Sequence, residues 1–288
     1  MRDVAVIGTG AMGSALVEAL VDSDAELAVW NRSTEKAEAL SGPRVHVAGS
    51  AAEALASSPL TIVAVSDHEL ARGLVEESGE DLTGKVVVST SFVTPDQARV
   101  FADAVSAAGG HYLDLSIPAY PSEVRSGAGV FLVSGHRAAY EAHRGWFERI
   151  GRASYVDEAP GAAYISEMAV LLAYLPMAVG LLQGVRICER HDLPLEWFKE
   201  TVLDLYPYHI RSLLDRVTAE AGSPAPQVEA SVDVWRDGAA EYAAYLRELG
   251  LDAGMYDALQ RLFSAASDAG DGDADWTCVA QHTATRER

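Results

Sequence analysis

Two kinds of hydrophobic pattern alternate through the first half of the chain. Short runs of apolar, mostly β-branched residues predict buried strands, and between them apolar residues recur at helical spacing. Unbroken apolar runs are typical of parallel strands covered on both faces, and strands that alternate with helices predict a doubly wound sheet. The predicted strands are 4–7, 26–30, 45–47, 60–65, 85–90, 112–115 and 130–133. The first helices are predicted from the turn after residue 10 to about residue 21, over 34–40 and over 51–56.

From about residue 160 the pattern changes to helices alone. The segment 159–185 contains one charged residue, Glu167, and belongs to a predicted helix that continues to about residue 189. A helix that is apolar on every face must be buried on every face. One small domain is too small to enclose so long a helix, so we expect a second subunit to cover it.

A membrane span is the alternative interpretation of this helix. The stretch 168–182 is unbroken apolar sequence, but it contains Pro176 and Gly180. It is also shorter than the roughly 18–20 residues that cross a bilayer. We therefore favour a soluble protein with no membrane partner.

A second helical pattern follows in the last third of the chain. Seven apolar residues recur with alternating spacings of four and three, which predicts a seam for close helix packing. We expect 222–226 to form the loop before it, 253–269 to form another helix that ends at 270–273, and 286–288 to be frayed. The seam residues are Val228, Val232, Trp235, Ala239, Tyr242, Leu246 and Leu249.

Composition narrows the choice of function class. The formal net charge of −20 argues against a nucleic-acid partner, because phosphates require a basic surface. Only two cysteines, Cys188 and Cys278, are present, so we expect a reducing compartment, the cytoplasm. The histidines and cysteines lack the spacing of metal ligands, and we expect no metal.

A glycine motif links the first strand to the first helix. Gly8, Gly10 and Gly13 form G-x-G-x-x-G between an apolar strand and a helical pattern. The first glycine permits the tight turn, the second lets the backbone approach a pyrophosphate, and the third lets helix and strand pack closely. The motif in this context predicts a dinucleotide site.

The end of the second strand indicates which dinucleotide is bound. An NAD site places an acid there for the ribose 2′-OH, whereas this chain has Asn31-Arg32-Ser33, with Lys36 one turn further. A guanidinium pairs bidentately with a 2′-phosphate, which an acid would repel. We predict NADPH; the alternative is an ordinary surface arginine.

Polar residues follow three other strands of the sheet. Ligands bind beyond the carboxyl ends of parallel strands. This places 66–67, 90–91 and 116–117 near the cofactor or the substrate. The residues expected to bind the cofactor are Gly8, Gly10, Ala11, Met12, Gly13, Asn31, Arg32, Ser33, Lys36, Val65, Ser66 and Thr90.

Glu167 is the polar exception on the long apolar helix. Tyr164, Leu171 and Tyr174 share its helix face. Burying an unpaired charge is expensive. Glu167 is therefore either a structural carboxylate bonded to a tyrosine or backbone group, or a functional carboxylate that faces the nicotinamide.

The motifs together resemble the β-hydroxyacid dehydrogenase superfamily, and within it the NADPH-dependent imine reductases and reductive aminases. The resemblance covers essentially the whole chain. It rests on residues 8–13, 31–33, 65–67, the loop that ends at Thr94-Pro95, Gly161-Ala162-Ala163, 239–242 and 249–252. It implies an α/β fold: an N-terminal Rossmann domain (1–159) with a doubly wound parallel sheet, a long interdomain helix, and a C-terminal all-α domain (160–288) for dimerisation and substrate binding.

The resemblance also implies a role for Glu167. In the hydroxyacid dehydrogenases the sixth residue after the helix-opening glycine is a catalytic lysine, and imine reductases carry Asp or Tyr there. Counting from Gly161 gives Glu167, whose extra methylene moves the carboxylate by about 1.5 Å. The chain departs from the dehydrogenases in having no Ser-Gly-Gly loop after Asp114, and its loop 89–95 is one residue longer than is usual.

The predicted reaction is hydride transfer from NADPH to the carbon of an imine or iminium, which gives an amine. Glu167 stabilises the cation or protonates the nitrogen, and Tyr174 is the second catalytic candidate. The small-molecule partner is an imine, or a ketone plus an amine, and the protein is a homodimer with exchanged helices. The expected substrate-binding residues are Ser91, Ile117, Tyr164, Leu171, Tyr206, His209 and Trp235, the last three from the partner subunit.

Two other function classes stay open. One is a β-hydroxyacid or carbonyl dehydrogenase with an altered catalytic residue. The other is a non-catalytic protein that binds NADPH.

Overall fold

The computed structural model describes residues 1–218 and 228–283 and divides into two units, Met1–Ala173 and Tyr174–Arg288. The division falls inside the long apolar helix α8 (Ala162–Arg190), which was predicted over 160–189. The predicted loop 222–226 and the frayed end 286–288 lie outside the described residues.

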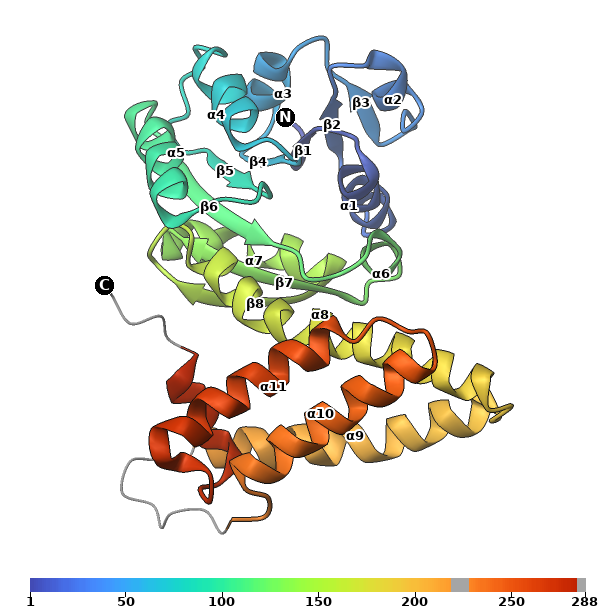
Figure 1. Ribbon diagram of the computed structural model, residues 1–288. Helices are drawn as coiled ribbons and strands as arrows, with labels where there is room; N and C mark the ends of the chain where they lie inside the picture. Colours follow the sequence, from blue (N-terminus) through green and yellow to red (C-terminus); the bar gives the residue numbers. More distant parts are fainter. Residues whose placement is uncertain (219–227, 284–288) are drawn as a thin grey trace. The chain divides into compact units, whose positions relative to one another are not determined.

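The first unit is built around one eight-stranded sheet (Figure 1). Its strand order is β3-β2-β1-β4-β5-β6-β7-β8, and β1 to β6 pair in parallel. The order reverses between β1 and β4, which is the point where a doubly wound sheet binds ligands. The strands are β1 (Val4–Ile7), β2 (Leu27–Trp30), β3 (Val45–Val47), β4 (Leu60–Val63), β5 (Val86–Ser89), β6 (His111–Ser116), β7 (Gly129–Gly135) and β8 (Gly151–Asp157).

The sheet is mostly, not wholly, parallel. β7 pairs antiparallel with β6, and β8, which was not predicted, adds to β7 in parallel. The sequence missed β8 because Gly151–Asp157 alternates half-buried and exposed residues and contains no apolar run. A strand of this kind covers an edge of the sheet, with its polar face turned to water.

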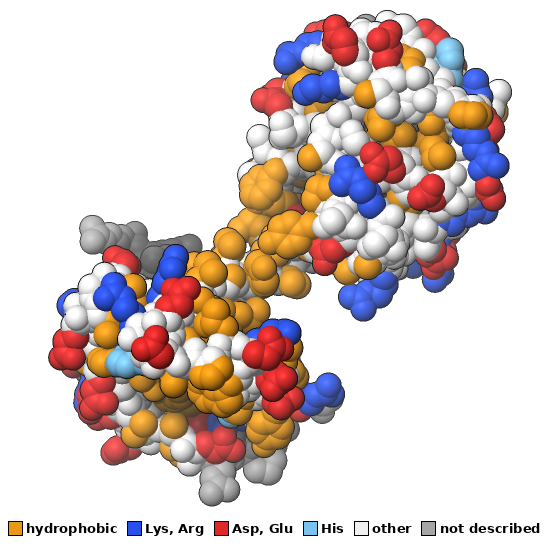
Figure 2. All heavy atoms as spheres, turned by 90° about the vertical axis from the view of Figure 1, so that its right-hand side faces the viewer, with side chains coloured by type: hydrophobic (Ala, Val, Ile, Leu, Met, Phe, Trp, Pro, Cys, Tyr) orange, Lys and Arg blue, Asp and Glu red, His pale blue; other side chains and the backbone are white. Residues whose placement is uncertain are grey.

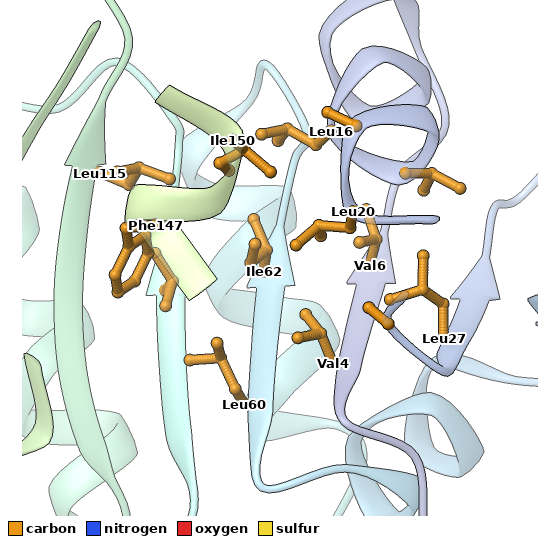
Figure 3. Packing of buried hydrophobic residues seen from close by; sticks show 14 of the residues in the cluster. Val4, Val6, Leu16, Leu20, Leu27, Leu60, Ile62, Leu115, Phe147 and Ile150 are labelled. Carbon is orange, nitrogen blue, oxygen red and sulfur yellow. The ribbon is translucent and has the colours of Figure 1, made fainter. Parts of the chain in front are cut away.

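The core of this unit is apolar on both faces of the sheet. Val4, Val6 and Ile62 lie fully or almost fully buried against the helix α1 (Ala11–Asp22), as Figure 3 shows. Burial on both faces is the reason that these strands read as continuous apolar runs. The other helices of the unit are α2 (Thr34–Glu38), α3 (Ala51–Ser57), α4 (His68–Glu76), α5 (Pro95–Ala107), α6 (Pro121–Arg125) and α7 (Arg137–Ile150); the last four were not predicted individually.

The second unit is helical. Its helices after α8 are α9 (Leu195–Val217), α10 (Val232–Glu248) and α11 (Gly254–Ala266), followed by a π-helical turn (Ser267–Asp271) and a 3₁₀ helix (Trp276–His282). α9 has 23 residues and continues through Pro207, and it carries Tyr206 and His209, two of the expected substrate-binding residues. The α11 prediction ended at 269, but the regular α-helix ends at Ala266.

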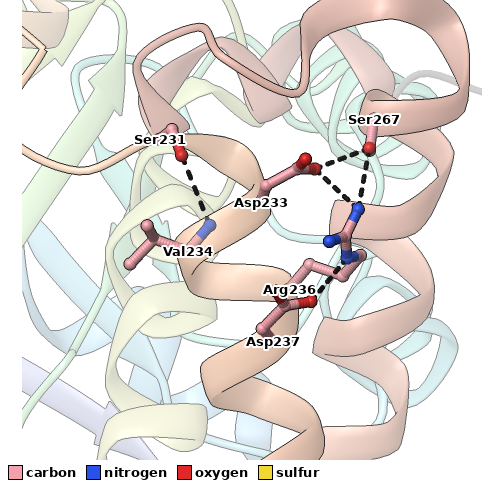
Figure 4. Close-up of polar contacts among 6 residues, drawn as sticks. All are labelled: Ser231, Asp233, Val234, Arg236, Asp237 and Ser267. Carbon is pink, nitrogen blue, oxygen red and sulfur yellow. Dashed lines mark hydrogen bonds and ion pairs between the residues drawn. The ribbon is translucent and has the colours of Figure 1, made fainter.

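A polar network joins α10 to the turn after α11 (Figure 4). The Ser231 hydroxyl accepts a hydrogen bond from the Val234 amide and caps α10. Asp233 pairs with Arg236 at 2.7 Å and accepts a hydrogen bond from Ser267 at 2.6 Å. The network fixes how the end of α11 meets the first turn of α10.

The positions of the predicted seam form two rows along the helix, each with a spacing of seven residues, and the structure covers one row and leaves the other largely exposed. Val232, Ala239 and Leu246, seven residues apart, are buried within the unit. Trp235 and Tyr242, which lie on the other row, are exposed by 40% and 54%. The seam therefore retains an apolar face that the described chain does not cover.

Helix α8 is exposed along most of its apolar length. Among the described residues it is the one helix long and apolar enough to cross a membrane, with a mean hydropathy of 1.9 over its best window and none of that window buried. Leu172, Leu175 and Leu182 are each more than 60% exposed. Hydrophobic side chains also gather on the visible surface of the helical unit (Figure 2).

Candidate active site

The turn between β1 and α1 has the geometry that its glycines predict. Gly8 adopts a φ of +98°, and a Cβ there would overlap the carbonyl oxygen of Ala64 on the neighbouring segment. A Cβ on Gly13 would overlap the carbonyl oxygen of Gly8, whereas a Cβ on Gly10 would meet no atom within 4 Å. Two glycines thus permit close backbone packing, and the third leaves open space above the helix N-terminus.

Asn31 connects this turn to the loop after β2. Its Oδ1 accepts a hydrogen bond from the Thr9 amide at 3.0 Å, and its Nδ2 donates to the Ser33 carbonyl at 3.0 Å. One side chain therefore holds the two loops that a dinucleotide would touch in a fixed relation.

Two cations border the same loop. Arg32 and Lys36 are exposed, and neither forms an ion pair within residues 1–218 and 228–283. Ser33 precedes α2 without a side-chain capping bond. The guanidinium, the ammonium and the hydroxyl are therefore available to an anion at this end of the site.

A cavity of about 610 Å³ extends from these loops along the carboxyl ends of the strands. Every residue predicted to bind the cofactor lines it, together with four of the predicted catalytic and substrate residues, Ser91, Ile117, Tyr164 and Glu167. Ser116, predicted near the cofactor or the substrate, lines it as well, whereas Asp67 does not. Residues not predicted there line it too: Trp30, Ala64, Leu70, Leu74, Ser89, Phe92, Val93, Asp114 and Leu115.

Glu167 lies at the wall of the cavity and is bonded to β6. The Ser116 hydroxyl donates a hydrogen bond to its Oε2. Tyr164, one turn earlier on α8, is buried, and desolvation followed by the charge of Glu167 raises the pKa of its phenol. At neutral pH the Tyr164 phenol beside Glu167 is therefore neutral.

A second carboxylate, Asp114, is buried two residues before Ser116. It accepts hydrogen bonds from the Tyr112 hydroxyl at 2.5 Å, from the Ser134 hydroxyl at 3.2 Å and from the Gly161 amide. Burial raises the pKa of Asp114 although these bonds act to lower it. The sequence feature that could have indicated a role for Asp114 is that it is the one acidic residue within the apolar strand 112–115.

Two aromatic residues meet at one side of the cavity. The rings of Phe92 and Tyr164 pack edge to face with centroids 4.1 Å apart. Phe92, on the loop after β5, is 71% exposed, so one of its faces is open to a ligand.

Comparison with known protein families assigns more than half of the chain to a family. Residues 3–159, more than half of the chain, match the family described as the NAD binding domain of 6-phosphogluconate dehydrogenase. The chain belongs to this family.

The chain is also similar to individual imine-reducing enzymes. An NADPH-dependent reductive aminase from Aspergillus oryzae (strain ATCC 42149 / RIB 40) is 26% identical over 187 residues, which make up 65% of this chain and 63% of that relative. The match thus spans less than two thirds of the relative's length.

Two solved structures share the fold over nearly all of both chains. An imine reductase from Pseudomonas sp. has a TM-score of 0.89 and 26% identity, with 98% of this chain and 99% of that chain covered. An imine reductase from Myxococcus stipitatus in complex with NADP⁺ has a TM-score of 0.85 and 28% identity, with 98% and 100% covered. The predicted fold and the resemblance to imine reductases and reductive aminases are confirmed.

In this family member the remaining predicted site residues lie outside the cavity lining. Leu171 is exposed on α8. Tyr174, Tyr206, His209 and Trp235 belong to the helical unit, where the His209 ring packs edge to face on Tyr208. Their part in the site stays a prediction. Among the described residues no group of three or more His, Cys, Asp or Glu is arranged to hold a metal ion.

Proposed function

We propose that this chain reduces the C=N bond of an imine or iminium to an amine, with NADPH as the reductant. The observation that supports this most directly is the Glu167 carboxylate, which Ser116 holds at the wall of a cavity that begins at the dinucleotide turn.

The residues of the cavity fit NADPH. The open space above Gly10 suits a pyrophosphate at the helix N-terminus, and the unpaired cations Arg32 and Lys36 suit a 2′-phosphate. When bound, NADPH supplies the hydride that reduces the substrate carbon.

Glu167 supplies the electrostatic part of the reaction. In its protonated form Glu167 would donate a proton to the imine nitrogen. As an anion it stabilises the positive charge of an iminium, which a lysine at the same position would repel. The neutral phenol of Tyr164 beside it is a hydrogen-bond donor for the substrate nitrogen, and Tyr174 is the second candidate for proton donation.

The proposed substrates are small and largely apolar. A reductive aminase from Aspergillus terreus was solved in complex with cyclohexanone and allyl amine, and an imine reductase from Aspergillus terreus in complex with dibenz[c,e]azepine. The exposed face of Phe92 and the side chain of Ile117 would contact the carbon skeleton of such ligands.

We also propose a homodimer with exchanged helices, with 160–288 as its dimerisation domain. It is supported by the exposed length of α8 and by the open row of the α10 seam, which includes Trp235 and Tyr242. A second copy would cover this surface in place of a membrane, and Trp235, Tyr206 and His209 of that copy would complete the substrate site. Light scattering should give twice 30.6 kDa; a stable, active monomer at micromolar concentration would contradict the dimer.

We also propose that the enzyme is cytoplasmic and has no nucleic-acid partner. Cys188 and Cys278 are free thiols, which suits a reducing compartment. The net charge of −20 disfavours binding to phosphate backbones.

The experiment is an NADPH oxidation assay against three substrate classes: dibenz[c,e]azepine as an imine, cyclohexanone with and without allyl amine, and a hydroxyacid assayed in reverse with NADP⁺. We expect turnover with the imine and with the ketone plus amine. Turnover with the hydroxyacid alone would favour a dehydrogenase, and NADPH binding without any turnover would favour a non-catalytic protein.

A further inference from the structure

Strand β6 holds the start of α8 at two points. Asp114 and Ser116 lie two positions apart, so they project from the same face of the strand. Asp114 accepts a hydrogen bond from the Gly161 amide, and Ser116 donates one to Glu167. Both contacts connect one strand to one helix across 47 and 51 positions of sequence.

The Asp114 contact continues into the first turn of the helix. The Ser134 hydroxyl, which donates to Asp114, also accepts a hydrogen bond from the Ala163 amide at 3.0 Å. The first amides of a helix have no partner within the helix, and a negative charge near them is favourable. Asp114 and Ser134 therefore supply acceptors for two of the amides at the start of α8.

The same turn is confined from a second side. Gly161 adopts a φ of +89°, and a Cβ there would lie 2.8 Å from the Cα of Pro95 at the start of α5. The first turn of α8 therefore has little freedom to shift or rotate. Glu167 follows six residues later, about 9 Å along the helix axis at about 1.5 Å per residue.

We propose that Asp114 is a positioning residue for Glu167: it fixes the first turn of α8 through Gly161 and Ser134, and thereby sets where the Glu167 carboxylate faces the cavity. This inference rests on the proposed function, because it assigns Glu167 a role in turnover. Asp114 is buried at 3% exposure. A carboxylate at that depth is costly to keep unless its bonds offset the burial.

The main variant is Asp114→Asn, which keeps the shape and can keep one acceptor for Gly161 but loses the charge. Tyr112→Phe is the matched control, because it removes a different donor to the same carboxylate and leaves both links to α8. We expect Asp114→Asn to lower kcat on dibenz[c,e]azepine by about ten- to a hundredfold, the usual cost of a slightly misplaced catalytic group. The KM for NADPH should change little, and Tyr112→Phe should keep a kcat close to that of the unmodified protein.

A double variant separates positioning from a general loss of structure. If Asp114 acts through Glu167, then Asp114→Asn together with Glu167→Gln should have the kcat of Glu167→Gln alone. Multiplied losses, or an Asp114→Asn variant with unchanged kcat, would overturn the inference. If Asp114→Asn does not fold, Ser134→Ala breaks the link to Ala163 and is tested in the same way.

Hydrogen exchange tests the inference without any substrate. Amides 161–167 should exchange faster in Asp114→Asn and Ser134→Ala than in Tyr112→Phe. Equal exchange in all three variants would overturn the positioning role even in an active enzyme. Faster exchange in a protein that reduces no imine would instead support the role of Asp114 and Ser134 in fixing the first turn of α8, while it would contradict the proposed function.

Discussion

Ser116, the last residue of β6, donates a hydrogen bond to Glu167 on α8, 51 positions later in the chain. This bond brings the one charged residue of a long apolar segment to the carboxyl edge of the sheet, where the dinucleotide turn also lies. It gives the Glu167 side chain a defined place at the cavity wall.

Replacing Glu167 by Gln keeps its shape and removes its charge. We expect kcat for imine reduction to fall by about 10²–10⁴, the usual range for general acid–base help, while NADPH affinity barely changes. Glu167→Asp should be milder, because it keeps the charge but draws it back toward the helix. If Glu167 is only structural, the Gln variant would melt at a lower temperature and each folded molecule would keep its turnover, so kcat and melting temperature should be measured on one preparation.

Arg32 should determine the choice between NADPH and NADH. Replacing Arg32 with Glu should raise the KM for NADPH at least about tenfold, which corresponds to about 1.4 kcal/mol of lost charge pairing. Steady-state kinetics with both cofactors measure this, with the remote exposed Arg99→Glu as the charge-matched control. Equal efficiency of the unmodified protein with NADPH and NADH would refute the assignment.

Gly10 and Gly13 should respond differently to a methyl group. Gly13→Ala forces a Cβ onto the Gly8 carbonyl, so we expect a loss of stability of about 1–3 kcal/mol or more from overpacking. Gly10→Ala meets open space, so it should keep the melting temperature and weaken NADPH binding. Thermal melts and NADPH titration of both variants check this, and a Gly10→Ala variant that binds NADPH normally would argue against a pyrophosphate above this turn.

The paired imidazoles of His111 and His136 predict a dependence of stability on pH. Their rings stack with centroids 4.0 Å apart, and desolvation, followed by the charge of His136, lowers the pKa of His111 below 6.5. As the pH falls, the unfolded chain therefore takes up this proton before the folded chain does. The contribution of neutral His111 to the free energy of unfolding is fully present above about pH 6.5, and it is lost as the pH falls through the lowered pKa of the folded protein.

The His111→Gln variant should lose less stability than the unmodified protein between about pH 7.5 and about pH 5, the range over which histidine titrates. Urea unfolding at both pH values measures the difference. An identical pH dependence in the two proteins would show that the pair does not contribute.

Sequence patterns predicted the parts of the site that are local in the chain. The turn from Gly8 to Gly13 and the loop at Arg32 depend on residues within one β-α-β unit. The residue types in that unit are therefore enough to predict what these two segments bind. The contacts of Asp114 and Ser116 with α8 depend on the register of β6 and the rotation of a helix some 50 residues away. No periodicity within either segment encodes that relation.

The missed elements have equally physical reasons. β8 has no apolar run because one of its faces meets water, and β7 pairs antiparallel with β6, a direction that hydrophobic pattern does not encode. Helix α9 extends through Pro207, where a pattern-based prediction shortens a helix.

Transfer of deuterium from NADPH that is dideuterated at nicotinamide C4 tests the central claim most directly. With dibenz[c,e]azepine as the substrate, the amine product should carry one deuterium at the former imine carbon and should form as fast as NADPH is consumed. An amine without the label, or consumption of NADPH without any amine, would contradict the assignment of this chain as an imine reductase.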